Sequence, residues 1–301
     1  MPPMIEKTMP VLIAYTLVVL IWGTTPLAII WSNGAGHFMV AVLWRMLLAL
    51  LVALLVNGLL GRRLFDRPGA GKVYLIASLG IFPNMPLVYY SAQFIPSGLI
   101  AVIFSLSPFV TGVLSLFILK DNPFNRPRLC ALALAVLGLA IIFRSQLAMD
   151  SGAAIGIVGI LGSCLLFSTS SVLLKAQLTG VDAFNQTTGS LLFAMPGLLA
   201  FWWLAGAPAP IIATQAVAAI IYLALFGSLL GFTLFFFVLS RLSPSVVSLI
   251  TLITPLLALT GGALLAGERL SAEALSGTLL VLLALVVYLD LMALVRRRLR
   301  F

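Results

Sequence analysis

Long apolar runs, separated by short polar or Pro/Gly breaks, occupy almost the whole chain. A helix needs about twenty apolar residues to cross the hydrocarbon core of a bilayer. The breaks divide the sequence into ten such runs, which predicts an all-α integral membrane protein with ten transmembrane helices. The spans are expected at residues 10–31, 37–57, 72–94, 96–119, 128–143, 152–176, 183–204, 211–239, 244–266 and 271–295.

Two of these runs share a pattern of prolines and acids. Residues 95–126 read IPSGLIAVIFSLSPFVTGVLSLFILKDNPFNR, and residues 243–270 read SPSVVSLITLITPLLALTGGALLAGERL. Each run opens on Pro-Ser near its start and carries a second proline in mid-run. Each then reaches an acidic residue at the same distance beyond that proline, Asp121 in one copy and Glu268 in the other. We interpret the two runs as copies of one repeat and the two acids as anchors at the ends of the spans.

Each half of the chain holds five spans, so two similar halves must insert with opposite orientation. The sequence predicts one repeat over residues 1–146 and an inverted repeat over residues 147–301. Inverted repeats are typical of secondary transporters, in which a substrate cavity near mid-membrane opens alternately to each side.

Composition and charge narrow the class of protein. The chain is 62% hydrophobic and 8% charged, and its mean hydropathy is +1.21, which excludes a soluble globule. The net charge of +9 comes from basic residues at the ends of apolar runs, so we expect the lipid bilayer as a partner and no nucleic acid. A monomer is compatible with these features.

The basic residues also predict orientation. With the amino terminus in the cytoplasm, only Arg144 and Arg269 fall in outer segments, and Arg45 lies within a span. This bias predicts a multi-pass protein of the cell (inner) membrane with both termini cytoplasmic.

Several stretches carry a family resemblance. The first span contains IWGTTP, the second WRMLLALLVALL and the ninth ITPLLALTGGALLAGERLSAEALSG, which together resemble the EamA-type members of the drug/metabolite transporter superfamily. The first copy departs from the repeat signature at Lys120, Asp121 and Cys130, which stands where Gly277 stands in the second copy. The resemblance implies a ten-helix exporter of small metabolites or drugs, similar to bacterial amino-acid and metabolite exporters. It further implies a central cavity lined mainly by the first, third, fourth, sixth, eighth and ninth spans.

Arg45 is the one basic residue well inside a predicted span, about 12 Å into a core of about 30 Å. An intramembrane charge is costly and indicates a function by default. Two interpretations stay open: a structural bond between helices, or a site for an anionic substrate group such as a carboxylate.

Pro108 and Pro255 lack an amide hydrogen and are expected to bend their helices near mid-membrane. The bends are either static packing kinks or hinges that let the two helices move during alternating access.

Other polar and aromatic side chains could line the cavity. On one continuous third helix, Ser78, Phe82, Tyr89 and Gln93 would share a face, whereas Asn84 would lie on another. Aromatic rings suit a planar or cationic substrate, but they can equally form a core or an interfacial belt; a lone hydroxyl can bond its own helix. The candidates for the cavity are Trp22, Thr25, Arg45, Ser78, Phe82, Asn84, Tyr89, Tyr90, Gln93, Ser168, Phe232, Ser248 and Thr251.

Several kinds of chemistry find no support in the sequence. No acid falls in the middle of a span, and the sole histidine, His37, lies at an outer helix end. We therefore expect no enzyme, no cofactor, no metal and no obligatory proton coupling. Cys130 and Cys164 lie singly in apolar runs and fit packing positions.

The favoured function is export of small metabolites by alternating access. Arg45 and the aromatic third and eighth spans favour amino acids, including large or aromatic ones. The alternative is a multidrug or lipophilic-cation exporter, proton-coupled or not, which the aromatics alone would support. A channel or lipid scramblase is a third class, which the paired prolines and the antiparallel repeat disfavour.

Overall fold

The computed structural model describes residues 4–120, 124–149, 152–177, 180–242, 247 and 250–288, and within these ranges every regular element is a helix. The elements are α1 (Met4–Ser32), η1 (Asn33–Ala35), α2 (Phe38–Leu59), α3 (Ala70–Ser78), α4 (Asn84–Ser91), α5 (Ser97–Phe104), α6 (Ser107–Ile118), α7 (Arg126–Met149), α8 (Ala153–Ala176), α9 (Ala183–Leu204), α10 (Thr214–Tyr222), the π-helical η2 (Leu223–Leu230), α11 (Gly231–Arg241), α13 (Ile250–Ala266) and α14 (Ala272–Tyr288). Seven helical segments of the described residues are long and apolar enough to span a membrane, and two further apolar helices are shorter.

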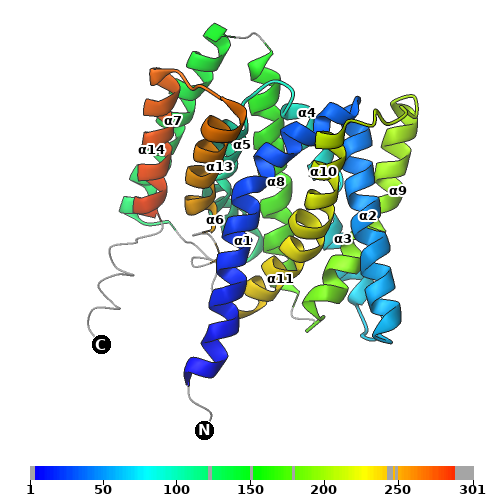
Figure 1. Cartoon of the computed structure of the whole chain (residues 1–301). Helices are drawn as coiled ribbons and strands as arrows, with labels where there is room; N and C mark the ends of the chain where they lie inside the picture. The colour runs from blue at the N-terminus through cyan, green and yellow to red at the C-terminus, as the bar shows by residue number, and fades with distance from the viewer. Residues whose placement is uncertain are drawn as a thin grey trace.

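The helices form one bundle, with α7 and α14 on one side and α2 and α9 on the other (Figure 1). The contact between α7 and α14 depends on two glycines. A Cβ atom on Gly138 would lie 2.7 Å from the carbonyl oxygen of Gly277, and a Cβ on Gly277 would lie 2.6 Å from that of Gly138. Small residues allow two helix backbones to approach closely in a membrane. This pair therefore packs backbone against backbone.

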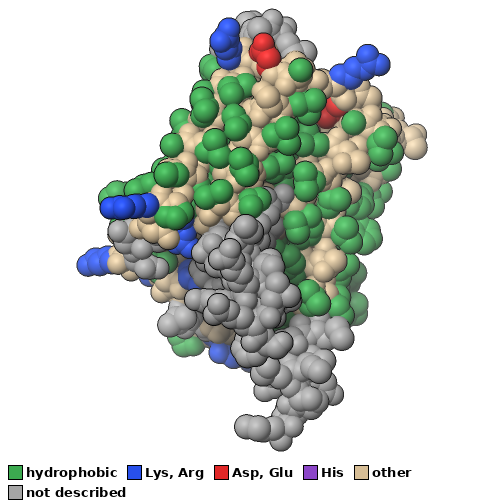
Figure 2. Space-filling view, turned by 90° about the vertical axis from the view of Figure 1, so that its left-hand side faces the viewer, with side chains coloured by type: hydrophobic (Ala, Val, Ile, Leu, Met, Phe, Trp, Pro, Cys, Tyr) green, Lys and Arg blue, Asp and Glu red, His purple; other side chains and the backbone are tan. Residues whose placement is uncertain are grey.

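Large apolar side chains cover the outside of the bundle. Leu204, Ile212 and Leu264 are 83%, 87% and 78% exposed. On the face shown in Figure 2, hydrophobic side chains spread over most of the visible described surface, and charged side chains gather toward its rims. A surface of this kind suits a lipid environment, in which apolar side chains face the acyl chains.

Polar side chains set the start of two helices. His37 precedes α2 and its ring Nδ1 accepts a hydrogen bond from the amide of Met39. Asp182 precedes α9 and its carboxylate accepts from the amides of Phe184 and Asn185, while Arg62 forms an ion pair with it at 3.1 Å. Such caps satisfy amides that have no partner within the helix.

The third predicted span differs most from the expectation. It consists of two short helices, α3 and α4, separated by turns over residues 79–83. Pro83 has no amide hydrogen, and the Asn84 side chain donates to the carbonyl of Gly80 at 2.8 Å, so the helical ladder is interrupted there. The sorting of Ser78 to Gln93 by the angle of one continuous helix is therefore wrong.

The fourth predicted span is interrupted as well, between α5 and α6. The other spans agree with the described helices within a few residues, except that α1 begins six residues earlier and α7 is longer than predicted. Residues 243–246, 248–249 and 289–301 of the ninth and tenth spans lie outside the described residues.

Candidate functional site

Two neighbouring cavities lie inside the bundle. The first, here called the Arg45 cavity, includes about 720 Å³ of empty space and is lined mostly by apolar side chains of α1, α2, α4, α5, α8, η2, α11 and α13. The second, here called the Lys175 cavity, includes about 620 Å³ and is lined by α1, α6, α8, α11 and α13 together with Leu119 and Val247. Both volumes include openings to solvent.

Arg45 is the charged group of the first cavity. Its side chain is 1% exposed; Nε donates to Ser228 Oγ at 2.8 Å and Nη1 donates to the Tyr89 hydroxyl at 3.2 Å. Among the residues that the structure describes, no carboxylate pairs with it and its Nη2 group has no hydrogen-bond partner. A buried guanidinium with N–H groups left over is a favourable place for an anion. Arg45 thus makes structural bonds and also retains donors.

Small residues on η2 and α11 make room for this arrangement. A Cβ on Gly227 would lie 3.2 Å from Arg45 Nη2, and a Cβ on Gly231 would lie 2.8 Å from Trp22 Nε1. The π-helical winding of η2 contains both Gly227 and the buried Ser228, which accepts from Arg45. Segments of π-helix are frequent at functional sites.

The two cavities adjoin at a set of shared side chains, here called the aromatic partition. Trp22, Phe167, Ile250 and Thr251 line both cavities. The rings of Trp22 and Phe167 meet edge to face at 5.9 Å between centroids, and Phe235 lies 4.9 Å from Trp22 and 5.3 Å from Phe167. Helices α1, α8 and α11 are thereby joined by rings at the centre of the bundle.

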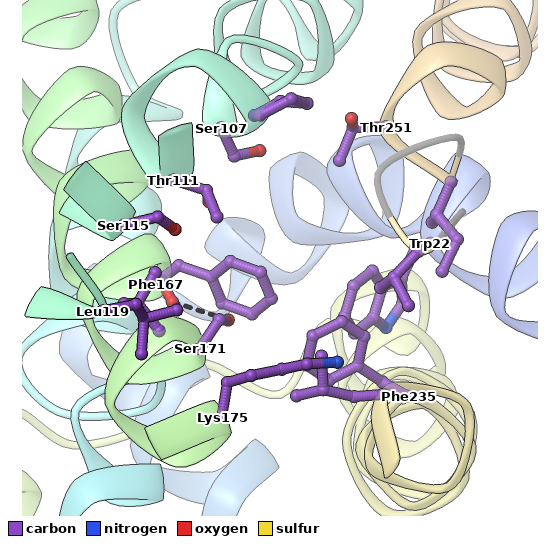
Figure 3. Close-up of a pocket in the computed structure, with 15 residues that line it drawn as sticks. Trp22, Ser107, Thr111, Ser115, Leu119, Phe167, Ser171, Lys175, Phe235 and Thr251 are labelled. Carbon is purple, nitrogen blue, oxygen red and sulfur yellow. Dashed lines mark hydrogen bonds between the residues drawn. The ribbon is translucent and has the colours of Figure 1, made fainter. Parts of the chain in front are cut away.

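Hydroxyl groups and one lysine mark the Lys175 cavity. Ser107, Thr111 and Ser115 line it from α6, and Ser171 lines it from α8 (Figure 3). Lys175, in the last turn of α8, donates from Nζ to the carbonyl of Leu242 at 3.2 Å. This cavity is the more polar of the two.

Some of the residues that the sequence suggested line these cavities. Trp22, Thr25, Arg45, Phe232 and Thr251 line the Arg45 cavity, and Trp22, Thr251 and Pro108 line the Lys175 cavity. Ser248 lies outside the described residues.

The remaining candidates line neither cavity. Tyr89 lies directly behind the Arg45 guanidinium, with its ring centre 5.8 Å from the Arg45 Cζ atom. Asn84 accepts from Ser163 of α8, and Ser168 donates to the Ser107 carbonyl at 3.3 Å. These contacts join helices.

The other third-span candidates also have local partners. Ser78 donates to the carbonyl of Leu75, and the exposed Gln93 donates to that of Tyr90. Phe82 lies against Phe201, and Tyr90 against Phe38 and Phe94.

The two prolines also differ from one another. Pro255 lies within α13, as a mid-helix proline. Pro108 instead lies in the first turn of α6, so the prediction that it bends a continuous helix is wrong. The helix has already ended at Phe104, because serine side chains next to the proline bond backward to the chain.

Sequence reasoning missed four residues at the centre of the site: Phe167, Lys175, Ser228 and Phe235. Lys175 is one of the basic residues at the ends of apolar runs, which predict only orientation, and the others lie in apolar runs where nothing local marks them. Their importance comes from what lies opposite on other helices.

Acidic groups are absent from both linings among the described residues. Glu268 lies at the end of α13 and accepts from Ser97 N at 3.0 Å, Ser97 Oγ at 2.9 Å and Gly98 N at 3.3 Å. It therefore caps α5, the helix that follows Pro96.

The EamA-like transporter family matches this chain at residues 9–144 and again at 154–289. This chain belongs to that family. The resemblance to EamA-type transporters in the sequence is thereby confirmed, and so is the class of membrane-embedded transporter.

Curated relatives of this EamA-like transporter cover most of its length. Protein PecM of Dickeya dadantii (strain 3937) is 25% identical over 280 residues, which is 92% of each chain. The uncharacterized transporter YoaV of Bacillus subtilis (strain 168) is 28% identical over 213 residues, 70% of this chain and 73% of that one. A probable amino-acid metabolite efflux pump of Salmonella typhimurium (strain LT2) is 25% identical over 216 residues, 68% of this chain and 72% of its own.

A solved crystal structure shares the fold of this EamA-like transporter, with a TM-score of 0.64 and 15% identity over 97% of this chain and 99% of that one. Family and relatives together identify a multi-pass membrane transporter of the drug/metabolite superfamily, and one of the relatives is named as a probable efflux pump.

Proposed function

We propose that this EamA-like transporter exports small metabolites, above all amino acids including large or aromatic ones, by alternating access and without obligatory proton coupling. The observation that carries this proposal is the buried Arg45 guanidinium, with a free Nη2 group, in a cavity walled by Trp22, Phe104 and Phe232. A cation beside aromatic rings suits a solute that combines a carboxylate with an apolar body.

The helix contacts support two inverted repeats of five crossings, over residues 1–146 and 147–301. Equivalent elements pack together in the pairs α2 with α9, α5 with α13 and α7 with α14. Other contacts occur in matched sets: α1 packs on α13 as α8 packs on α6, and α1 packs on α11 as α8 packs on α4. Reporter fusions at both termini and in the segment after α7 would test the orientation. Cytoplasmic readouts at both termini and an outer readout after α7 are expected.

The test of function is solute uptake by purified protein in liposomes. The panel contains amino acids, the amines that correspond to them without the carboxylate, nucleobases and quaternary ammonium compounds, each with and without a pH gradient. Saturable counterflow of amino acids is expected, and it would exclude a channel. Preferred transport of quaternary amines would favour the lipophilic-cation alternative instead, and strong accumulation driven by pH alone would overturn the absence of proton coupling.

Arg45→Gln is expected to reduce amino-acid transport about tenfold or more, because a hydrogen bond to a charged group contributes about 1.5 to 3 kcal/mol. Transport of the matched amines should change little, which would show that the variant still folds and moves solutes. Arg63→Gln, at an exposed site near the end of α2, is the matched control. Equal losses for the acids and the amines would contradict the role of Arg45 in binding the carboxylate.

A further inference from the structure

We propose that the Lys175 cavity is a second solute site, which takes the anionic end of an amphipathic solute and lies in series with the Arg45 cavity. This inference rests on the proposed function for its place in a transport path. The binding site itself follows from the contacts in the cavity.

Lys175 is half-buried and presents its ammonium to the cavity. One of its three N–H groups is used by the carbonyl of Leu242 at 3.2 Å. In Figure 3 its side chain extends toward the side of the cavity on which Trp22 and Phe235 lie. Arg241, at the end of α11, is by contrast exposed, bonds among the described residues only Phe237 and Ser240 of its own helix, and lines neither cavity.

Two hydroxyls on α6 lack the bonds that hydroxyls usually make in a helix. Thr25, Thr169 and Ser171 each donate to a carbonyl one turn earlier in their own helix. The hydroxyl groups of Thr111 and Ser115 make no hydrogen bond within the described part of the chain, although both residues line the cavity. They lie one helical turn apart on α6, so both can offer a donor to the same solute group.

The Lys175 cavity lies next to the Arg45 cavity. Trp22 and Phe167 line both cavities, so each face of this aromatic partition has one cationic side chain near it, Lys175 on one side and Arg45 on the other. A carboxylate can bind at Lys175 while the apolar body of the solute lies against the rings. Movement of the partition would then transfer the solute to Arg45.

Fluorescence of Trp22 gives a test that does not require transport. Replacement of Trp31, Trp44, Trp202 and Trp203 by Phe leaves Trp22 as the single tryptophan. Iodide, an anionic quencher, and acrylamide, a neutral one, are then compared at constant ionic strength. Lys175→Gln is expected to lower the iodide quenching constant roughly twofold, the effect of one unit charge at about 8 Å in water. Acrylamide quenching should stay the same, and Lys175→Arg should restore iodide quenching.

The control for charge at the same end of the bundle is Lys72→Gln, an exposed site at the start of α3, which should leave both quenchers unchanged. Benzoate, but not benzamide, should protect Trp22 from iodide in the parent and in Arg45→Gln, and this protection should disappear in Lys175→Gln. Equal iodide quenching in the parent and Lys175→Gln, or protection that depends on Arg45 alone, would overturn the second site. A protein that moves no amino acids but shows these quenching differences would contradict the proposed function and leave the anion site in place.

Discussion

Pro108 and Pro255 hold matching places in two similar stretches of sequence, yet the chain around them takes different shapes. Around Pro108 the crossing is divided into α5 and α6, and the proline lies in the first turn of the second helix. Around Pro255, α13 continues as one helix from Ile250 to Ala266. The same residue therefore starts a helix in one repeat and interrupts only the hydrogen bonds of a helix in the other.

Serine side chains explain the divided crossing. Pro108 cannot donate to the carbonyl of Phe104, four residues earlier, and the Ser107 hydroxyl donates to that carbonyl instead. Ser105 likewise donates to the carbonyl of Val102. In the second copy Thr254 stands in the place of Ser107, but Leu252 stands in the place of Ser105. Ser105, whose hydroxyl bonds the backbone one turn earlier, is therefore the polar residue that only the divided crossing has.

The divided crossing of α5 and α6 is also stabilised by contacts with α13. Glu268, at the end of α13, caps the start of α5, and α5 packs against α13. Close approach at this contact requires Gly98 and Gly262. The start of α5 in one copy is therefore fixed by the end of the unbroken helix α13 in the other copy.

The largest effect on this contact is expected for Gly98→Val. A Cβ at residue 98 would lie 2.5 Å from Leu259 Cδ2 and 3.3 Å from Leu259 Cα, so α5 and α13 would have to separate. We expect the free energy of unfolding in detergent to fall by about 3 kcal/mol. Gly58→Val, where nothing lies within 4 Å, is the control, and a similar loss there would show that the contact is not the cause.

Adjacent glycines on α13 provide a closely matched second test. A Cβ on Gly262 would clash with Glu268 Oε2 and lie 2.9 Å from Ser97 Oγ, whereas the first contact of a Cβ on Gly261 would be Leu27 at 3.8 Å. Gly262→Ala should therefore lower the free energy of unfolding by about 2 kcal/mol, because the carboxylate must leave its site. Gly261→Ala should be neutral or stabilise by up to about 1 kcal/mol. Chemical unfolding monitored by circular dichroism measures both, and equal values would refute the cap as the cause.

Removal of the charge from the cap should have a smaller effect. Glu268→Gln keeps one oxygen acceptor but loses the charge at the start of α5, and we expect a loss of about 1 kcal/mol. A double-mutant cycle with Ser97→Ala measures the coupling, since the second substitution should cost little once the first is present. Asp66→Asn, at an exposed acid, is the control. Additive effects of the two substitutions would rule out the bond between them.

Substitution of the two prolines should change stability less than the substitutions above. Its effect on transport tests whether Pro108 and Pro255 act differently. Pro255→Ala restores an amide hydrogen within α13 and is expected to slow solute transport about fivefold, which corresponds to about 1 kcal/mol in the barrier, if bending there accompanies alternating access. Pro108→Ala should have little effect on the rate. Amides in the first turn of a helix have no carbonyl partner within that helix, so an alanine amide at this position gains no helical bond. Initial rates in liposomes at equal protein content measure both variants. Unchanged rates in Pro255→Ala, or equal slowing in both, would reject the hinge.

Predictions from the sequence succeeded where the physics is local. The apolar runs located α9 at its two ends, residues 183 and 204, and placed most other helices within a few residues, because a chain in lipid must satisfy its backbone within each helix. They failed at residues 79–83 and at Ser105, where side-chain bonds compete with the helical ladder. The spacing of apolar residues along the chain does not reveal this competition between side-chain and helical hydrogen bonds.

The residues of the candidate site were likewise predictable only in part. The isolated charge of Arg45 within an apolar run was visible in the sequence, and so was Trp22 within the stretch that resembles the family pattern. Phe167 and Phe235 were not distinguishable from other apolar residues of their spans, and the third-span aromatics line neither cavity, although Tyr89 bonds Arg45. Which aromatic faces a cavity depends on how several helices are rotated against each other.

The sequence by itself determined the membrane environment, the helical class, the repeat and the family, because these depend on composition, run length and short motifs. Only the tertiary structure placed Ser228 against Arg45 across 183 positions of sequence, set Lys175 and Arg45 on opposite sides of the Trp22–Phe167 partition, and brought Glu268 to Ser97. A cavity is formed by side chains of helices distant in sequence. Its lining is therefore decided by how the helices pack, which cannot be read from any single run of residues.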